Sequence, residues 1–335
     1  MKKFTYIIPL VFIVISFFGC EAEEEDFIYL NPSTTSQSKI GVVIQDAITN
    51  DFQSWLQSNG YGNYDFLRND LIGGSFGGKI NSTDQVVNQP VIFIHGNSDK
   101  ALGDVFGQSG WTDSRDYFVS QGYTNAELYG FTWGPADAYQ SGSQYHSYAY
   151  LTQIRAFIQA VKTYTGASKV DIISHSMGVT LGRKAIKGGS GYDAAVGNYN
   201  LGSSLTSSVD AFVGIAGANQ GLVSCYQVNG ATATCDNDNG LYPGYLWWGY
   251  GPYGVSDYLV DINSTTNYEG AYTYSIWSTA DQIIGYGNLV YGQYTSRIPG
   301  QNGEKTYSSS PYGHFNLKDM TEAVQYQMVK NHNIP

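Results

Sequence analysis

The stretch that decides the fold is Val170-Asp171-Ile172-Ile173-Ser174-His175-Ser176-Met177-Gly178-Val179. It opens with a short apolar run, which is typical of a strand buried on both faces of a parallel sheet. Ser174, Ser176 and Gly178 follow in the pattern Ser-x-Ser-x-Gly, and residues 179–185 are compatible with a helix. This is the nucleophile elbow Gly-x-Ser-x-Gly with serine in place of the first glycine. We therefore expect Ser176 to stand on a sharp strand-to-helix turn.

The small residues around Ser176 are those that such a turn requires. The backbone at the serine is strained, so the positions two before and two after it must not crowd the turn. The helix that follows points its free N–H groups and the positive end of its dipole at a developing negative charge. The pattern alone is common by chance, and the buried strand in front of it makes Ser176 a candidate nucleophile.

Further strands and helices alternate on both sides of this stretch. Apolar runs predict strands, and amphipathic stretches predict helices, at 91–94 (strand), 114–121 (helix), 126–131 (strand), 151–164 (helix), 169–173 (strand), 211–216 (strand) and 272–277 (strand). This alternation predicts an α/β fold with a mostly parallel, doubly wound sheet and an active site at the carboxyl ends of its strands. The periodicity fails between residues 219 and 270, where we expect an irregular Tyr/Gly-rich insertion over the site.

A general base for Ser176 follows from elimination. The chain has five histidines, His95, His146, His175, His314 and His332. The first two precede the serine, the third lies inside the elbow, and the last stands close to the C-terminus. In the α/β-hydrolase fold the chain order is nucleophile, acid, base, which leaves His314. Gly313 before it suits a loop that carries an imidazole over the serine.

The acid must lie between nucleophile and base. Asp281 follows the predicted strand 272–277 and so falls at a carboxyl strand end, where it would hold the base in the right tautomer. Three other carboxylates compete with it. Asp210 precedes a strand, and Asp257 and Asp261 lie in the irregular segment. Asp281 is therefore our candidate.

An oxyanion hole needs two N–H donors aimed at the tetrahedral oxygen. We expect one from the backbone of Met177, directly after the nucleophile, and the other from the backbone of Asn97. Asn97 belongs to His95-Gly96-Asn97, the loop after the first buried strand. These three residues would also suit an ordinary turn, but their position after the first buried strand favours a role in the oxyanion hole.

Composition and charge exclude several classes of protein. The formal net charge is −11, with 17 Lys and Arg against 28 Asp and Glu, whereas nucleic-acid binding needs a basic footprint. The sequence holds neither a glycine-rich phosphate loop nor a Cys/His cluster with zinc spacing. We therefore expect neither a cofactor nor a metal.

The N-terminal residues 1–20 are typical of an export signal. Two lysines precede an apolar run over 6–18 that is too short to span a bilayer. Cys20 stands where a bacterial lipoprotein has its lipidated cysteine, although Phe17 is a poor match three positions before it. We expect lipidation of Cys20 and an anchor in a membrane, at the cell surface or outer membrane. Simple secretion, with Cys20 discarded, is the alternative.

The rest of the chain divides into two parts. An acidic and then Ser/Thr-rich stretch over 21–40 predicts a tether, and 41–335 forms one catalytic domain. With Cys20 lipidated or lost, only Cys225 and Cys235 remain, and two cysteines in an exported chain usually form a disulfide. A reduced pair is the alternative.

Four motifs, taken together and in order, resemble those of the class 2 lipases. They lie at 91–97, 170–178, 278–281 and 313–314. The resemblance implies Ser176, Asp281 and His314 as a catalytic triad and Asn97 and Met177 as the oxyanion hole, with no required metal or cofactor.

Two further features resemble more closely a secreted poly(3-hydroxybutyrate) depolymerase that acts on amorphous polymer. They are residues 95–99 (His-Gly-Asn-Ser-Asp) and residues 216–226, with Cys235 after them. The chain departs from its relatives at Ser174, where alanine or glycine is frequent, and in the distinct segment 236–270. That segment would shape the substrate surface.

Three functions follow as hypotheses. The first is an exported lipase or esterase that opens acylglycerols or similar acyl esters through an acyl-enzyme. The second is an extracellular polyester depolymerase, for which Trp247 and Trp248 could form an apolar platform, although such aromatics more often pack loops against the body. The third, of another class, is a catalytically silent surface lipoprotein that binds lipid. The sequence leaves the oligomeric state open.

Overall fold

The structure is a computed structural model that describes residues 36–37, 43–228 and 230–335, all within the compact unit Thr34–Pro335. The predicted signal segment 1–20, Cys20 and nearly all of the predicted tether lie outside the described residues. No helix among the residues described is long and apolar enough to cross a membrane.

A seven-stranded sheet forms the centre of the unit. Its strands in spatial order are β17 (Gly303–Tyr307), β14 (Tyr272–Ser278), β11 (Val209–Ile215), β8 (Val170–His175), β4 (Val91–Ile94), β7 (Leu128–Phe131) and β3 (Ser75–Phe76). All neighbouring strands pair in parallel except β3, which pairs antiparallel with β7 at one edge. The predicted mostly parallel sheet is thus confirmed.

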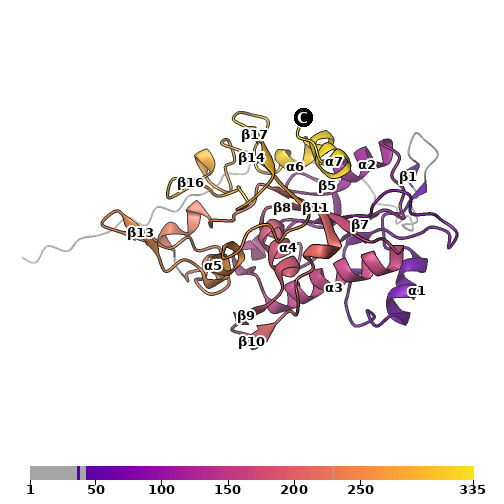
Figure 1. Ribbon diagram of the computed structural model, residues 1–335, viewed down its shortest axis with the longest axis horizontal. Coiled ribbons are helices and arrows are strands. Elements are labelled where there is room, and N and C mark those ends of the chain that lie inside the picture. Colours follow the sequence, from indigo (N-terminus) through magenta and orange to yellow (C-terminus); the bar gives the residue numbers. More distant parts are fainter. Residues whose placement is uncertain (1–35, 38–42, 229) are drawn as a thin grey trace, which may run out of the picture. The chain divides into compact units, whose positions relative to one another are not determined.

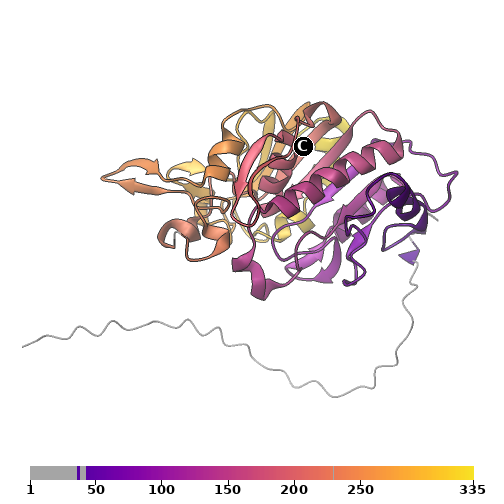
Figure 2. The same ribbon diagram turned by 90° about the horizontal axis from the view of Figure 1, so that it is seen from below.

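Helices cover both faces of this sheet. They are α1 (Asn50–Ser58), α2 (Thr112–Ser120), α3 (Tyr148–Thr165), α4 (Met177–Lys187), α5 (Asp257–Asn263), α6 (Asn316–Asp319) and α7 (Glu322–Asn331). Figures 1 and 2 show α1, α3 and α4 on one face and α2, α6 and α7 on the other. The sheet is therefore doubly wound, as predicted.

Each face has its own hydrophobic core, because successive residues of a strand point to opposite faces. Ile172 of β8 packs in one core with Phe157 of α3. Ile173, the next residue, packs in the other core with Phe118 of α2. Because both faces of the sheet are covered, Ile172 and Ile173 are both apolar, and β8 is buried along its whole length.

Helix and strand ends differ from the predictions by a few residues. The helix expected over 151–164 begins at Tyr148, because Ser147 caps it by accepting a hydrogen bond of 3.2 Å from the Tyr150 N–H. It ends at Thr165, because the next residue, Gly166, has a φ of 70° that terminates the helix. β17 was not predicted, since this edge strand has partly exposed residues and lacks an apolar run.

Short elements connect the sheet and helices. The remaining strands form two-stranded pairs, β1 (Ser36–Gln37) with β2 (Val43–Ile44), β5 (Leu102–Val105) with β6 (Gln108–Gly110), β9 (Ser190–Asp193) with β10 (Gly197–Asn200), β12 (Tyr245–Trp247) with β13 (Tyr250–Tyr253) and β15 (Leu289–Val290) with β16 (Gln293–Tyr294). Short 3₁₀ helices are η1 (Ala138–Ser143), η2 (Thr206–Ser208), η3 (Val223–Gln227), η4 (Ala233–Cys235) and η5 (Tyr286–Asn288).

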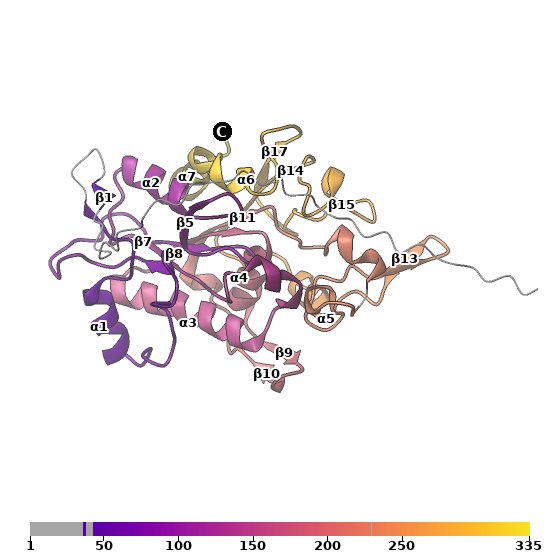
Figure 3. The same ribbon diagram turned by 180° about the vertical axis from the view of Figure 1, so that it is seen from behind.

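The segment that lacks periodicity leaves the carboxyl end of β11 and returns to the sheet at β14. It contains only short elements, among them the hairpin β12–β13, which extends away from the rest of the unit (Figures 1, 2 and 3). Cys225 and Cys235 form a disulfide in this segment, with a Cα–Cα distance of 5.2 Å, and Tyr242 packs against it. The predicted disulfide is therefore present.

Candidate active site

Ser176 stands on the turn between β8 and α4. Its φ of 54° and ψ of −128° lie outside the regions that L residues prefer, and its N–H donates to the Ile215 carbonyl at 2.8 Å. A Cβ at Gly178 would lie 2.3 Å from the His95 carbonyl oxygen, so only glycine fits there. The buried Ser174 donates its hydroxyl to the Val213 carbonyl at 3.3 Å. The serine that replaces the first glycine of the motif thus has a hydrogen-bond partner.

His314 and Asp281 meet Ser176 at the carboxyl ends of β8, β14 and β17. His314 Nε2 lies 3.0 Å from Ser176 Oγ, and His314 Nδ1 lies 2.8 Å from Asp281 Oδ2. Asp281 Oδ1 accepts hydrogen bonds of 2.9 Å from the N–H groups of Ile283 and Ile284. Asp281 and His314 are both buried. The structure therefore brings the three predicted residues together in the order that proton transfer from the serine requires.

The competing carboxylates lie elsewhere. Asp210 pairs with Lys169 at 2.9 Å. Asp261 pairs with Lys184 and with Lys187, both at 2.8 Å. Asp257 is an exposed residue at the start of α5. None of these three is among the described partners of the His314 ring.

Two of the other histidines are buried structural groups. His95 accepts a hydrogen bond of 3.0 Å from the Trp133 N–H and stacks on the Trp133 ring, and burial lowers its pKa to about 3. His146 lies between the Asn239 carbonyl and the Thr180 hydroxyl, and burial lowers its pKa to about 4. Both imidazoles are therefore neutral near pH 7.

His175, inside the elbow, contacts the loop of the candidate base. Its Nε2 lies 3.0 Å from the His314 carbonyl oxygen, so the N–H there donates to that carbonyl. Burial first, and the neighbouring His314 second, hold the pKa of His175 well below its usual range. His175 thus acts as a neutral donor that fixes the backbone of His314.

The predicted oxyanion donors belong to two segments that adjoin Ser176. Met177 is the first residue of α4, and Asn97 lies in the loop after β4, where its side-chain amide donates to the Ser141 carbonyl at 2.9 Å. A Cβ at Gly96 would lie 2.9 Å from the Ser176 Cβ and 3.0 Å from His175 Nδ1. This close packing, which requires glycine, holds the loop of Asn97 directly against the elbow.

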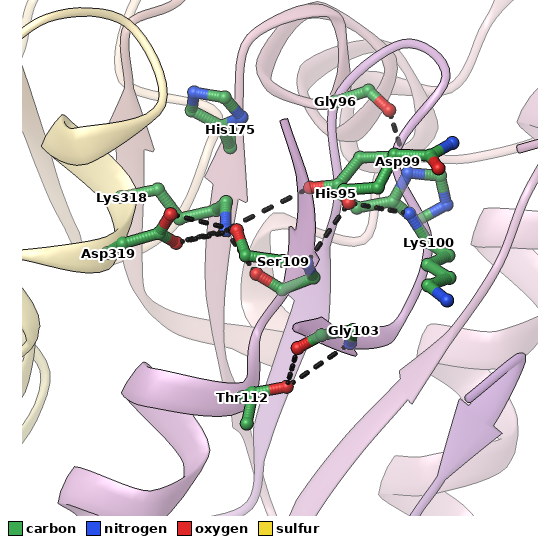
Figure 4. Close-up of polar contacts among 12 residues, drawn as sticks. His95, Gly96, Asp99, Lys100, Gly103, Ser109, Thr112, His175, Lys318 and Asp319 are labelled. Atoms are coloured by element: carbon green, nitrogen blue, oxygen red, sulfur yellow. Dashed lines mark hydrogen bonds and ion pairs between the residues drawn. The ribbon is translucent and has the colours of Figure 1, made fainter. Parts of the chain in front are cut away.

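A buried polar network, which sequence reasoning missed, fastens the same loop (Figure 4). Asp99 Oδ1 accepts hydrogen bonds from the N–H groups of Lys100 at 2.9 Å and Gly110 at 3.0 Å. Lys318 Nζ, from α6, donates to Ser109 Oγ at 2.7 Å and lies 3.9 Å from Asp99 Oδ2. Burial raises the pKa of Asp99 and the ammonium of Lys318 opposes that effect.

The network also includes Asp319, which contacts both Lys318 Nζ and Ser109 Oγ, the latter at 2.8 Å. The segment just after His314 is thereby joined to the hairpin β5–β6 and to the loop of Asn97. The candidate base and the loop of the predicted oxyanion donor Asn97 therefore share one buried support. The adjacent Lys318 and Asp319 were the sequence signal for it, and that signal is weak because charged residues are usually solvated.

The fold and these contacts can be compared with known proteins. Residues 88–327 match the family described as Lipase (class 2). The chain belongs to the class 2 lipase family. As a member, it is an α/β hydrolase of the lipase and esterase type.

Two solved structures are similar to this class 2 lipase. Lipase B of Aspergillus fumigatus shares 15% identity, with 91% of this chain and 64% of that chain covered and a TM-score of 0.48. The mature form of Bacillus licheniformis lipase BlEst2 shares 11% identity, with 76% and 96% covered and a TM-score of 0.45. The chain thus spans less than two thirds of the length of the Aspergillus enzyme.

No group of His, Cys, Asp and Glu in the described part of the chain is arranged to hold a metal ion. The site consists of a hydroxyl, an imidazole, a carboxylate and backbone N–H groups. This set of groups is suited to acyl transfer.

Proposed function

We propose that this class 2 lipase is an exported hydrolase of acylglycerols or similar acyl esters, with Ser176 as nucleophile, His314 as base and Asp281 as its orienting acid. The observation that carries the proposal is the continuous line of contacts from Ser176 Oγ to His314 at 3.0 Å and on to Asp281 at 2.8 Å. The position of Ser176 on a strand-to-helix turn supports the proposal further.

In the acylation step, Ser176 Oγ attacks the carbonyl carbon of the ester and its proton passes to His314 Nε2. The N–H groups of Asn97 and Met177 stabilise the oxyanion. The bond from carbon to the leaving alcohol oxygen then breaks, and His314 gives its proton to that oxygen. Asp281 stays ionised and stabilises the imidazolium.

In the deacylation step, a water molecule attacks the acyl carbon of the acyl-enzyme, and His314 takes the proton from this water. The second oxyanion collapses, the bond between the acyl carbon and Ser176 Oγ breaks, and His314 returns the proton to Ser176. The carboxylic acid leaves, and the enzyme is restored.

Labelling with a fluorophosphonate tests the nucleophile. The full chain should be labelled, and Ser176→Ala should not. An unlabelled native chain would favour the third hypothesis, a lipid-binding surface lipoprotein without catalysis. Labelling that survives in Ser176→Ala would place the nucleophile elsewhere.

The alternative substrate is an aliphatic polyester. The motif at residues 95–99 and the exposed Trp247 and Trp248 favour it. Initial rates on tributyrin, on a long-chain triglyceride and on amorphous polyhydroxybutyrate separate the two substrates. Strong polymer erosion with negligible turnover of both acylglycerols would reverse the order of the proposals.

Export is the remaining part of the proposal, with 1–20 as signal, 21–40 as tether and 41–335 as catalytic domain. The Cys225–Cys235 disulfide supports it, because disulfides persist mainly in oxidising compartments. We propose lipidation of Cys20 and attachment to the cell surface or outer membrane. Mass spectrometry of the mature N-terminus tests it, and a free amine beyond residue 20 would contradict lipidation.

A further inference from the structure

The hairpin β12–β13 exposes nearly all of its large side chains. Its strands are joined by a two-residue turn at Trp248 and Gly249, whose φ values of 50° and 83° suit a tight hairpin turn. The exposed fractions are 64% for Trp247, 85% for Trp248 and 72% for Tyr250. The other exposed large side chains of the hairpin are Tyr245, Leu246 and Tyr253. The aromatics therefore do not serve to pack this loop against the body, and folding leaves their apolar surface in water.

The base of the hairpin, in contrast, is firmly held. Tyr242 is buried against the Cys225–Cys235 disulfide, and its carbonyl accepts a hydrogen bond of 3.0 Å from the N–H of the buried Ser256. The Tyr291 hydroxyl donates to the Gly244 carbonyl at 2.6 Å. Because the lower end of the hairpin is fixed, the aromatic side chains at its exposed tip are ordered before they contact a surface. This order lowers the entropic cost of that contact.

Charge narrows the choice of partner. Residues 239–256 contain no charged side chain, in a chain whose formal net charge is −11. Anionic bilayers attract clusters of Lys and Arg, and the hairpin has none. An uncharged apolar surface is therefore the partner that suits it. Tyr and Trp favour the boundary between an apolar phase and water, because their rings are apolar and their O–H and N–H groups remain hydrated.

Topology relates this surface to the reaction. The hairpin belongs to the segment that leaves the carboxyl end of β11, and Ser176 follows the carboxyl end of the neighbouring strand β8. A second apolar element comes from the same edge of the sheet, since the exposed Phe106 of the β5–β6 turn packs on Phe315, next to His314. Attachment through the hairpin would thus turn the reactive edge toward the surface that supplies the ester.

We propose that the hairpin β12–β13 is an adsorption element that holds this enzyme on the surface of neutral acylglycerol droplets. The inference rests on the proposed hydrolysis of acylglycerols for the choice of droplet. It assigns to Trp247, Trp248 and Tyr250 a role in contact with the lipid phase, separate from the chemistry at Ser176.

Adsorption of the full chain to triolein droplets tests the inference, with flotation of the droplets and assay of the protein left in the water. Every variant carries Ser176→Ala, so that the droplets stay intact. The hairpin variant adds Trp247→Ser, Trp248→Ser and Tyr250→Ser. The matched control changes three exposed apolar residues of other surface segments, Val87→Ser, Tyr192→Ser and Val196→Ser. Circular dichroism and thermal unfolding verify that both variants fold.

We expect the partition of the hairpin variant into the droplet layer to fall at least about tenfold, the factor that corresponds to about 1.4 kcal/mol. The control should partition like the Ser176→Ala parent. Equal partition of the hairpin variant and its parent would overturn the inference. Preference of the parent for anionic phosphatidylglycerol vesicles or for amorphous polyhydroxybutyrate particles over triolein would also overturn it. So would a lipid-free dimer that the hairpin substitutions separate into monomers.

The proposed chemistry is measured apart from adsorption. The same two sets of substitutions are made with Ser176 retained, and turnover of the water-soluble p-nitrophenyl butyrate is followed. The hairpin variant should keep the native rate on this ester. An inactive native chain would overturn the proposed function and leave the adsorption result standing. Normal turnover together with unchanged adsorption would overturn only the role of the hairpin.

Discussion

Lys318 Nζ donates a hydrogen bond of 2.7 Å to Ser109 Oγ across 209 positions of the chain. Lys318 follows His314 closely in the sequence, and Ser109 lies in β6, in the hairpin that follows the loop of Asn97. The contact therefore joins the segment of the proposed base to the segment of a proposed oxyanion donor. Because Lys318 is buried beside Asp99 and Asp319, its removal would leave their charges without the ammonium group that offsets them.

We predict that Lys318→Met lowers the free energy of unfolding by about 3 kcal/mol or more, since removing one partner of a buried ion pair leaves the others uncompensated. It should also lower kcat for a soluble ester, because both loops lose their common support. Urea unfolding and steady-state kinetics measure the two effects. The control is Lys330→Met, which removes an exposed lysine bound to Asn88 and should change neither quantity. Native stability in Lys318→Met would contradict the role of the network.

Asp281→Asn should lower kcat about 10⁴-fold with little change in folding, because an amide facing His314 Nδ1 favours the wrong tautomer of the base. The control is Asp257→Asn, which changes an exposed carboxylate of α5. Kinetics on p-nitrophenyl butyrate, with circular dichroism for the fold, measure the effect. A loss smaller than about tenfold, which is about 1.4 kcal/mol in the barrier, would assign the acid to another residue.

Gly96→Ala should lower kcat by about 10²-fold, the effect of losing one oxyanion donor. The new methyl group would lie 2.9 Å from the Ser176 Cβ, so the loop that carries Asn97 must move away from the elbow. KM should change less than kcat, since the donor acts on the oxyanion. Gly62→Ala is the control, because its Cβ would meet neighbours only at 3.5 Å and beyond. Unchanged kcat in Gly96→Ala would show that the loop does not supply a donor.

Stability should fall as the pH drops below about 6.5, the ordinary pKa of histidine. Burial lowers the pKa of His95 to about 3 and of His146 to about 4, and it holds the pKa of His175 well below its usual range. In this window the unfolded chain binds protons at these sites that the folded chain excludes, so stability rises with pH. Burial acts in the opposite sense on Asp171, whose pKa it raises to about 7, and on Asp99, whose pKa is also raised.

The three histidines whose pKa is lowered outweigh Asp171 in this window, so the free energy of unfolding should decrease with a measurable slope as the pH falls from about 6.5 toward about 5. Urea unfolding at pH 7, 6 and 5 measures this slope. His146→Gln should reduce it, whereas His332→Gln, at a partly exposed position near Asp210, should leave it unchanged. A flat or opposite slope in the native chain would contradict the assignment of neutral buried imidazoles.

The parts of the fold that are local in sequence could be predicted. The strand, turn and helix around Ser176 follow from an apolar run, a small-residue pattern and a helical stretch that are contiguous. β17 could not be found this way, because its five residues gain their place from pairing with β14 and are only partly buried. Helix ends were also uncertain, since the Ser147 cap that begins α3 depends on a side-chain hydrogen bond.

Some residues of the candidate site could likewise be predicted from the sequence, and others could not. Chain order and a small number of histidines sufficed to propose His314, and the structure brings it to Ser176 and Asp281. The support from Lys318 was missed, since its contact with Ser109 joins distant segments and a lysine is usually solvated. The exposed state of Trp247 could not be predicted, because composition alone does not distinguish a packed aromatic side chain from an exposed one.

The hydrogen bond between Tyr242 and Ser256 closes the hairpin segment at its base, so the chain leaves and re-enters the body at nearly one point. Residues 245–254, all of them exposed, therefore lie between two fixed ends. Sequences of other lengths and polarity could be grafted there while the contacts of the buried ends, the sheet and the residues around Ser176 are kept. Evolution and design could thus alter which surface the enzyme works on while its bond-breaking chemistry stays constant.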